Sequence, residues 1–169
     1  MKRLFLLTII TLVSCNRKEV NPFDSFTFSD AGLHHDYSMK FTNSDTIYLQ
    51  TRFPSSVENY YAIITKEDRK NLNQFIEKLN FKKYDTIYAQ ENLDDGRSLL
   101  FRILNRKENH WIFIYGHNGP KELFEFAKWL TNFKEKQKFK PSSKASDYGN
   151  LKYILPPPPP PKIDTITNK

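Results

Sequence analysis

Residues 98–133 read SLLFRILNRKENHWIFIYGHNGPKELFEFAKWLTNF, and they carry the clearest structural pattern in the chain. Two runs of aliphatic and aromatic side chains, residues 98–104 and 110–115, are separated by five polar residues, which predicts a β-hairpin. Past Gly116 and Pro120, apolar side chains recur three and four positions apart, as they do on one face of a helix. That stripe consists of Leu123, Phe126, Ala127, Leu130 and Phe133. A hairpin followed by an amphipathic helix predicts a sheet with a helix packed on it.

The first half of the chain has a similar organisation. Residues 65–80, TKEDRKNLNQFIEKLN, predict a second helix, because Thr65 is a good N-cap residue and acidic side chains follow it in the first turn. Asn80 is expected to end this helix. Its apolar stripe consists of Leu72, Phe75, Ile76 and Leu79. Alternating or β-forming segments predict further strands at residues 23–28, 36–41, 46–53, 60–64 and 86–88.

Together these elements predict one α+β domain over residues 23–140. Two helices with one apolar stripe each need a sheet face to cover, so we expect an antiparallel sheet of about five to seven strands with both helices on one face. Residues 45–50 (DTIYLQ) and 85–90 (DTIYAQ) match in five of six positions. This match leaves two readings open: a tandem ββα repeat, or chance similarity in a chain rich in strands.

The composition limits the classes of function. The chain has 169 residues, with 26 Lys+Arg against 19 Asp+Glu and a net charge of +7. Residues 20–140 hold 18 basic and 16 acidic side chains, so the globular part carries little excess charge and a nucleic-acid partner is not expected. A single Cys excludes an internal disulfide framework and a multi-cysteine zinc site.

The N-terminal residues predict export. Two basic residues, Lys2 and Arg3, precede the apolar run Leu4–Val13 (LFLLTIITLV). Ten residues make about 15 Å of helix, half of the roughly 30 Å hydrocarbon core, so this segment is typical of a signal peptide rather than a membrane span. It ends in Leu12-Val13-Ser14-Cys15, which resembles the lipobox of bacterial lipoproteins.

The lipobox resemblance implies that residues 1–14 are removed and that Cys15 carries a thioether-linked diacylglycerol, often with a third acyl chain such as palmitate on its new amine. Residues 15–22 would then be a short lipidated tether in contact with the bilayer. By analogy with the family, Asn16 favours the outer membrane of a Gram-negative cell. We therefore expect a lipid-anchored protein of the cell envelope, facing the periplasm or the exterior.

Motifs that would support catalysis or a cofactor are missing from the sequence. His34-His35-Asp36 lacks a third ligand at metal-site spacing, and Asp94–Gly96 lacks the spacing of a calcium loop. Residues 116–120 precede a helix and could receive an anion, but every helix start offers such a site and we favour a tight strand-to-helix turn. We find no nucleophile elbow, P-loop or dinucleotide motif. No enzyme, cofactor or metal is therefore expected. A small hydrolase that uses His110 or His117 is kept as an alternative to the two binding functions given below.

Two features favour protein binding. The first is a set of aromatic and histidine side chains beyond those the helix stripes require: Trp111, Tyr115, His117, Phe124 and Trp129. The second is the tail, residues 141–169, which we expect to be flexible. It contains six consecutive prolines: Pro156, Pro157, Pro158, Pro159, Pro160 and Pro161. Six prolines in the polyproline II conformation form a stiff rod of about 19 Å, which could dock in an aromatic groove or only act as a spacer.

The sequence therefore favours a membrane-anchored, non-catalytic accessory or protein-binding module that acts on another protein of the cell envelope. An inhibitor or immunity-type protein, which neutralises an enzyme in the same compartment, fits the same features. The identity of the partner does not follow from the sequence.

Overall fold

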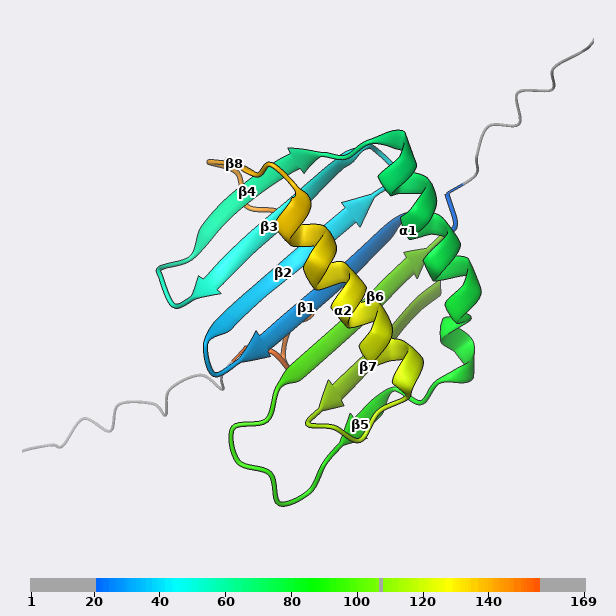
Figure 1. Ribbon diagram of the computed structural model, residues 1–169, viewed down its shortest axis with the longest axis vertical. Coiled ribbons are helices and arrows are strands. Elements are labelled where there is room, and N and C mark those ends of the chain that lie inside the picture. The colour runs from blue at the N-terminus through cyan, green and yellow to red at the C-terminus, as the bar shows by residue number, and fades with distance from the viewer. Residues whose placement is uncertain (1–20, 107, 156–169) are drawn as a thin grey trace, which may run out of the picture.

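The computed structural model describes residues 21–106 and 108–155. Within these residues, eight strands form a single open sheet and two long helices cover one of its faces (Figure 1). The helices are α1 (Lys66–Leu79) and α2 (Lys121–Lys136), and a short 3₁₀ turn, Phe81–Lys83, follows α1. The strands are β1 (Ser25–Gly32), β2 (His35–Thr42), β3 (Thr46–Phe53), β4 (Glu58–Ile63), β5 (Ile87–Ala89), β6 (Ser98–Asn105), β7 (Glu108–Tyr115) and β8 (Lys140–Pro141).

The strand order across the sheet is β5-β7-β6-β1-β2-β3-β4-β8. Strands β1 to β4 form an antiparallel meander, the β6–β7 hairpin joins it beside β1, and only β5 pairs in parallel, with β7. The predicted α+β class is confirmed. The sheet exceeds the predicted five to seven strands because β8 is a two-residue strand that no sequence pattern indicated.

The ends of α1 follow the local sequence. The hydroxyl of Thr65 accepts a hydrogen bond from the backbone N–H of Asp68 at 3.0 Å, and the Asp68 carboxylate accepts one from the backbone N–H of Thr65 at 3.3 Å. This reciprocal pair is a capping box, which satisfies two N–H groups at the helix start. Asn80 ends the helix in a left-handed conformation with φ of 35°. Both predicted helix boundaries are confirmed.

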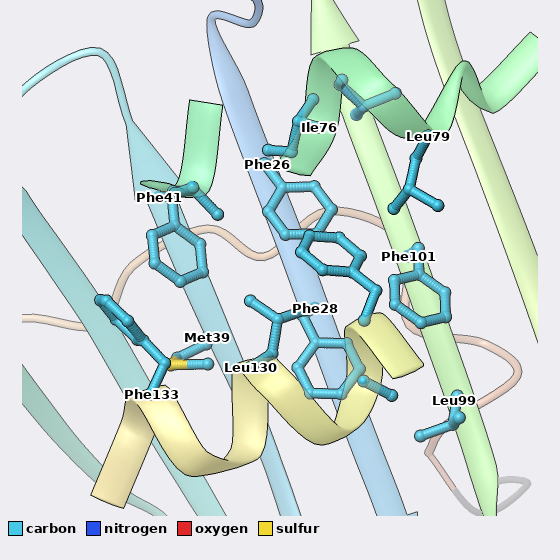
Figure 2. Packing of buried hydrophobic residues seen from close by; sticks show 14 of the residues in the cluster. Phe26, Phe28, Met39, Phe41, Ile76, Leu79, Leu99, Phe101, Leu130 and Phe133 are labelled. Atoms are coloured by element: carbon cyan, nitrogen blue, oxygen red, sulfur yellow. The ribbon is translucent and has the colours of Figure 1, made fainter. Parts of the chain in front are cut away.

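The core lies between the helices and the sheet, and it is built mainly from phenylalanine (Figure 2). Strand residues two apart face the same side, so Phe26 and Phe28 of β1 both point towards the helices. Phe126 of α2 is fully buried, and its ring lies 5.6 Å from that of Phe26 and 5.9 Å from that of Phe101. On its other side it stacks at 5.0 Å on Phe75 of α1, so one ring ties both helices to the sheet.

The two DTIY segments do not occupy equivalent positions. Residues 45–50 enter β3, an inner strand that pairs antiparallel with β2 and β4. Residues 85–90 contain β5, a three-residue edge strand that runs parallel to β7. A hairpin followed by a helix does occur twice, as β3–β4–α1 and β6–β7–α2, but the matching sequences are not the equivalent parts of those two units.

The end of the domain differs from the prediction. Residues 141–155 were assigned to a flexible tail, but residues 142–155, here called the strap, lie across the sheet face that the helices leave open (Figure 1). Tyr148 and Ile154 of the strap are only 5% and 8% exposed. The folded domain therefore extends to residue 155, because these apolar side chains cover apolar strand residues. The predicted proline segment 156–161, Cys15 and the signal peptide lie outside the described residues.

Candidate functional site on the strap face of the sheet

The strap face has an apolar half on strands β6 and β7. Because side chains alternate along a strand, Ile112 and Ile114 of β7 point into the main core, whereas Trp111, Phe113 and Tyr115 point away from the helices. These side chains would expose a large aromatic area if nothing covered them.

The end of the strap covers this apolar half. The ring of Tyr153 stacks on Phe113 at 4.9 Å and on Trp111 at 5.2 Å. Beside it, Ile154 packs against Leu100 and Phe113 in a small separate cluster. The backbone N–H of Ile154 donates to the carbonyl of Leu151 at 2.8 Å, which closes a turn. The last residues before the prolines are therefore fixed on the sheet.

The middle of the strap is held by polar contacts. The ammonium of Lys40 in β2 donates to the backbone carbonyl of Asp147 at 2.6 Å. Burial raises the pKa of the Tyr148 phenol, so this side chain is neutral under ordinary conditions. At its start the strap continues from β8, and the backbone N–H of Ser142 donates to the carbonyl of Asn59 at 2.8 Å.

Arg102 of β6 lies beneath the strap, between two small cavities of about 160 Å³ and 130 Å³. Its Nε donates to Oδ1 of Asn109 at 3.0 Å. Its Nη1 is buried and has no hydrogen-bond partner within residues 21–106 and 108–155. Gly149 of the strap crosses directly over it: a Cβ there would lie 1.8 Å from Nη1, and Gly149 also has a positive φ of 78°.

Three of the predicted binding residues lie on or beside β7. Trp111 is half-buried under Tyr153. The hydroxyl of Tyr115 donates to the Leu93 carbonyl at 2.8 Å and accepts from the Gly96 N–H at 3.0 Å, so it holds the loop before β6 in place. His117 is exposed in the turn that leads to α2.

The other two predicted binding residues lie on the helix side of the sheet. Phe124 and Trp129 belong to α2, and both are half-buried rather than exposed. Trp129 packs against Phe75 at 5.1 Å and Phe133 at 5.3 Å. The five predicted residues therefore do not form one surface, because the sheet separates Trp111 and Tyr115 from Phe124 and Trp129.

A second polar cluster surrounds Asp30, whose side chain is 1% exposed on the helix side of β1. Arg97 donates to both carboxylate oxygens, from Nε at 2.8 Å and from Nη2 at 2.6 Å. His35 Nε2 lies 2.9 Å from Oδ1, and the hydroxyl of Tyr37 donates to Oδ2 at 3.1 Å. The Tyr37 hydroxyl also lies 3.2 Å from that of Thr131 in α2. The cluster thus joins the β1–β2 hairpin to α2.

The charges of this cluster balance one another. Burial alone would raise the pKa of Asp30, but the hydrogen bonds from Arg97 and His35 outweigh it and hold this pKa below its usual value. Burial, with the charge of Asp30 beside it, raises the pKa of Tyr37. Both groups keep their ordinary ionisation states, carboxylate and neutral phenol. Since each oxygen of Asp30 already accepts two contacts, the arrangement is suited to holding the fold together.

The histidines considered as ligands or catalysts are separated in the structure. His35 contacts Asp30, whereas its neighbour Asp36 accepts two hydrogen bonds from Arg52, at 2.9 and 2.5 Å, on the strap face. His110 Nε2 lies 3.4 Å from a Glu108 carboxylate oxygen. Across residues 21–106 and 108–155, no three His, Cys, Asp or Glu side chains come together as a metal site would need.

Sequence reasoning missed the strap residues that complete this face, Gly149 and Tyr153 above all. The signal was present: Tyr148, Leu151, Tyr153 and Ile154 place four apolar side chains within seven residues before the prolines. Such a density is unusual for a flexible linker, whose composition is typically polar.

Comparison with known proteins gives no assignment: no protein-family model matches the chain, and no curated protein matches it. Among the helices of residues 21–155 that the structure describes, none combines the length and apolar character of a membrane span.

Proposed function

We propose that this chain is a membrane-anchored lipoprotein of the cell envelope. Its α+β domain acts as a non-catalytic module that holds a proline-rich segment for binding by a partner protein. The anchor rests on the lipobox-like residues that end in Cys15, and the presenting role rests on the geometry of the described domain.

The observation that carries the proposal is the separation of the two ends of the described chain (Figure 1). At its start, the side chain of Asn21 donates to the carbonyl of Asn43, in the turn between β2 and β3, at 3.0 Å. At its end, Ile154 belongs to a cluster that includes Ala31 and Tyr115. These two residues lie at the C-terminal ends of β1 and β7, which are the strand ends farther from the β2–β3 turn. From Ser25 to Ala31, β1 covers about 20 Å, so the two ends of the described chain are separated along the length of the strands.

This separation suits presentation away from a bilayer. Residues 15–22 reach only about 25 Å when fully extended, which keeps the N-terminal end of the domain near an acylated Cys15. The prolines follow Leu155 directly in the sequence, and the stack of Tyr153 on Phe113 and Trp111 fixes the described chain just before them. A proline-rich ligand gains affinity from such a rigid attachment, because less conformational entropy is lost on binding.

The polar clusters also favour binding over catalysis. The buried carboxylate of Asp30 bonds to Arg97, His35 and Tyr37 within the domain, and Asp36 bonds to Arg52. Neither carboxylate is left with an unpartnered oxygen facing a cavity, as a general base would need.

Two comparisons test the proposal in the native host. For the anchor, wild type and Cys15→Ser are labelled with palmitate and fractionated; we expect label and membrane recovery only for wild type. For the ligand, the chain is solubilised in detergent and co-purified with its envelope partner. We expect that replacing residues 156–161 by Gly and Ser at equal length abolishes recovery of that partner.

The matched control replaces residues 164–169 by Gly and Ser in the same way, and it should leave partner recovery unchanged. If the proline replacement retains the same partner at wild-type yield, the prolines act only as a spacer and the presenting role is wrong. If Cys15→Ser is labelled like wild type, the anchor is wrong.

A further inference from the structure

The larger of the two cavities beside Arg102 has the composition of a ligand site. It measures about 160 Å³ and lies between strands β6 and β7 and the strap. Its lining includes Arg102, Asn109, Trp111, Asn150, Lys152 and Tyr153. The volume is about five times the roughly 30 Å³ that one water occupies, and below the roughly 300 Å³ of drug-sized pockets, so it suits a small molecule or one chemical group.

The charged residues that line the cavity are all basic. Arg102 and Lys152 both line it, and its lining contains no carboxylate. Neither cation takes part in a salt bridge within residues 21–106 and 108–155. The nearest acidic strap residue, Asp147, instead accepts a hydrogen bond from the backbone N–H of Gly149 at 2.7 Å. Two uncompensated cations beside one cavity favour an anion there.

Arg102 adds an independent observation. It lines both cavities, its Nε donates to Asn109, and its Nη1 is buried against Gly149, so the guanidinium is held in a fixed position beside the larger cavity. A guanidinium is the side chain best suited to a carboxylate or phosphate, because its N–H groups form a planar fork.

The remaining wall is aromatic. Trp111 and Tyr153 stack with their rings 5.2 Å apart and 26° from parallel, and both line the cavity. The ammonium of Lys152 lies 4.6 Å above the ring of Tyr153, so the cation is placed next to the aromatic wall. A flat or apolar substituent would contact these rings while its charged group meets the cations.

From these observations, we infer that the cavity under the strap binds a small organic anion, with a carboxylate or phosphate at Arg102 and Lys152 and a flat apolar part against Trp111 and Tyr153. The site goes beyond the proposed presenting role and does not depend on it. Anion binding would bridge the strap to the sheet, since Lys152 and Tyr153 come from the strap and Arg102 and Trp111 from strands.

Tryptophan fluorescence of the detergent-solubilised full chain tests the inference. The chain has two Trp residues, so Trp129→Phe leaves Trp111 as the reporter in the cavity. The probes are benzoate, phenyl phosphate and benzamide, the last being a neutral analogue of benzoate with the same shape. We expect a saturable change with at least one anion, at a dissociation constant at least tenfold lower than that of benzamide. Tighter benzoate binding identifies a carboxylate ligand, and tighter phenyl phosphate binding a phosphate ligand.

Variants in the same background locate the site. Arg102→Gln should weaken binding of the better anion at least tenfold, and so should Lys152→Gln, which changes an exposed side chain and should not impair folding. Lys128→Gln removes an equal charge from the exposed side of α2 and should have no effect. The inference is overturned if neither anion binds more tightly than benzamide. It is also overturned if Lys152→Gln binds like Lys128→Gln.

Discussion

The guanidinium of Arg97 holds the buried carboxylate of Asp30 through two hydrogen bonds, at 2.8 and 2.6 Å, and the two side chains differ sharply in exposure. Asp30 is 1% exposed, whereas Arg97 is 43% exposed. If Asp30 is replaced, water can solvate Arg97, but if Arg97 is replaced, a carboxylate remains buried. The cost of breaking this pair therefore depends on which partner is removed.

We expect Arg97→Ala to lower the free energy of unfolding by about 3 kcal/mol, because it leaves a buried charge with only His35 and Tyr37 as partners. Asp30→Asn should cost less, because its amide can still accept from Tyr37 and Arg97 can be hydrated. Urea unfolding followed by circular dichroism measures both, with the exposed Lys128→Ala as the control, expected within about 0.5 kcal/mol of wild type. Equal losses for Arg97→Ala and Asp30→Asn would contradict the asymmetry.

The same carboxylate should make stability depend on pH. The pKa of Asp30 lies below its usual value in the folded state, so its stabilisation is present above the unfolded pKa, about 3.9, and disappears as pH falls through the folded pKa. The difference in unfolding free energy between wild type and Asp30→Asn should therefore be constant above about pH 5 and shrink below pH 4. Urea titrations at a series of pH values measure it; a difference that stays constant to pH 2 would argue against this role.

Phe126 should be the most costly single truncation in the core. Its ring stacks on Phe26, Phe75 and Phe101, which come from the sheet and from the other helix. We expect Phe126→Ala to lower the free energy of unfolding by about 3–5 kcal/mol. Phe53, which is 48% exposed at the end of β3, provides the control, and Phe53→Ala should cost less than about 1 kcal/mol. Similar losses for both would mean that this contact network does not carry the core.

Much of the fold could be predicted because local patterns and tertiary packing agree. The stripe on residues 121–136, the alternation in residues 36–41 and the N-cap at Thr65 each specify an element that the structure contains. The DTIY match does not mark equivalent strands, because β propensity does not specify which strands pair: Ile47 and Tyr48 lie in an inner antiparallel strand, whereas Ile87 and Tyr88 lie in a parallel edge strand.

The candidate site could not be predicted to the same extent. Trp111 was identified as a binding residue, but its partner Tyr153 is 42 positions away, in a segment that forms neither helix nor strand. Asp30 lies beyond the predicted strand at residues 23–28 and belongs to no motif, because Arg97 meets it only after β6 pairs with β1. Contacts of this kind depend on strand order, which the sequence of one chain does not reveal.

The stack of Trp111 on Tyr153 should contribute measurably to holding the strap. The two rings are 5.2 Å apart, and such aromatic pairs add about 0.5–1.5 kcal/mol beyond the area they bury. A double-mutant cycle with Trp111→Ala, Tyr153→Ala and the double variant measures this coupling by urea unfolding. Trp129 and Tyr153 lie on different sides of the sheet. A control cycle, in which Trp129→Ala takes the place of Trp111→Ala, should therefore give no coupling with Tyr153→Ala. An absence of coupling between Trp111 and Tyr153 would mean that the strap end is held by other contacts.

Gly149 should be the residue at which the strap is most sensitive to substitution. Its φ of 78° is unfavourable for any residue with a Cβ, and that Cβ would lie 1.8 Å from Nη1 of Arg102. We expect Gly149→Ala to loosen the strap from the sheet, at a cost of about 1–2 kcal/mol from backbone strain alone. Because Lys144 and Lys152 lie on either side, trypsin should cleave the variant at these residues several-fold faster than wild type.

A second glycine makes this experiment specific. Gly32 does not have a positive φ, and a Cβ there would lie 3.2 Å from the side chain of His35, which can move aside. Gly32→Ala should therefore leave cleavage at Lys144 and Lys152 at the wild-type rate. Combining Gly149→Ala with Arg102→Ala removes the steric conflict but not the backbone strain. The double variant should therefore regain only part of the wild-type protection from trypsin. If Gly149→Ala is cleaved no faster than Gly32→Ala, the strap does not depend on the close approach of Gly149 to Arg102.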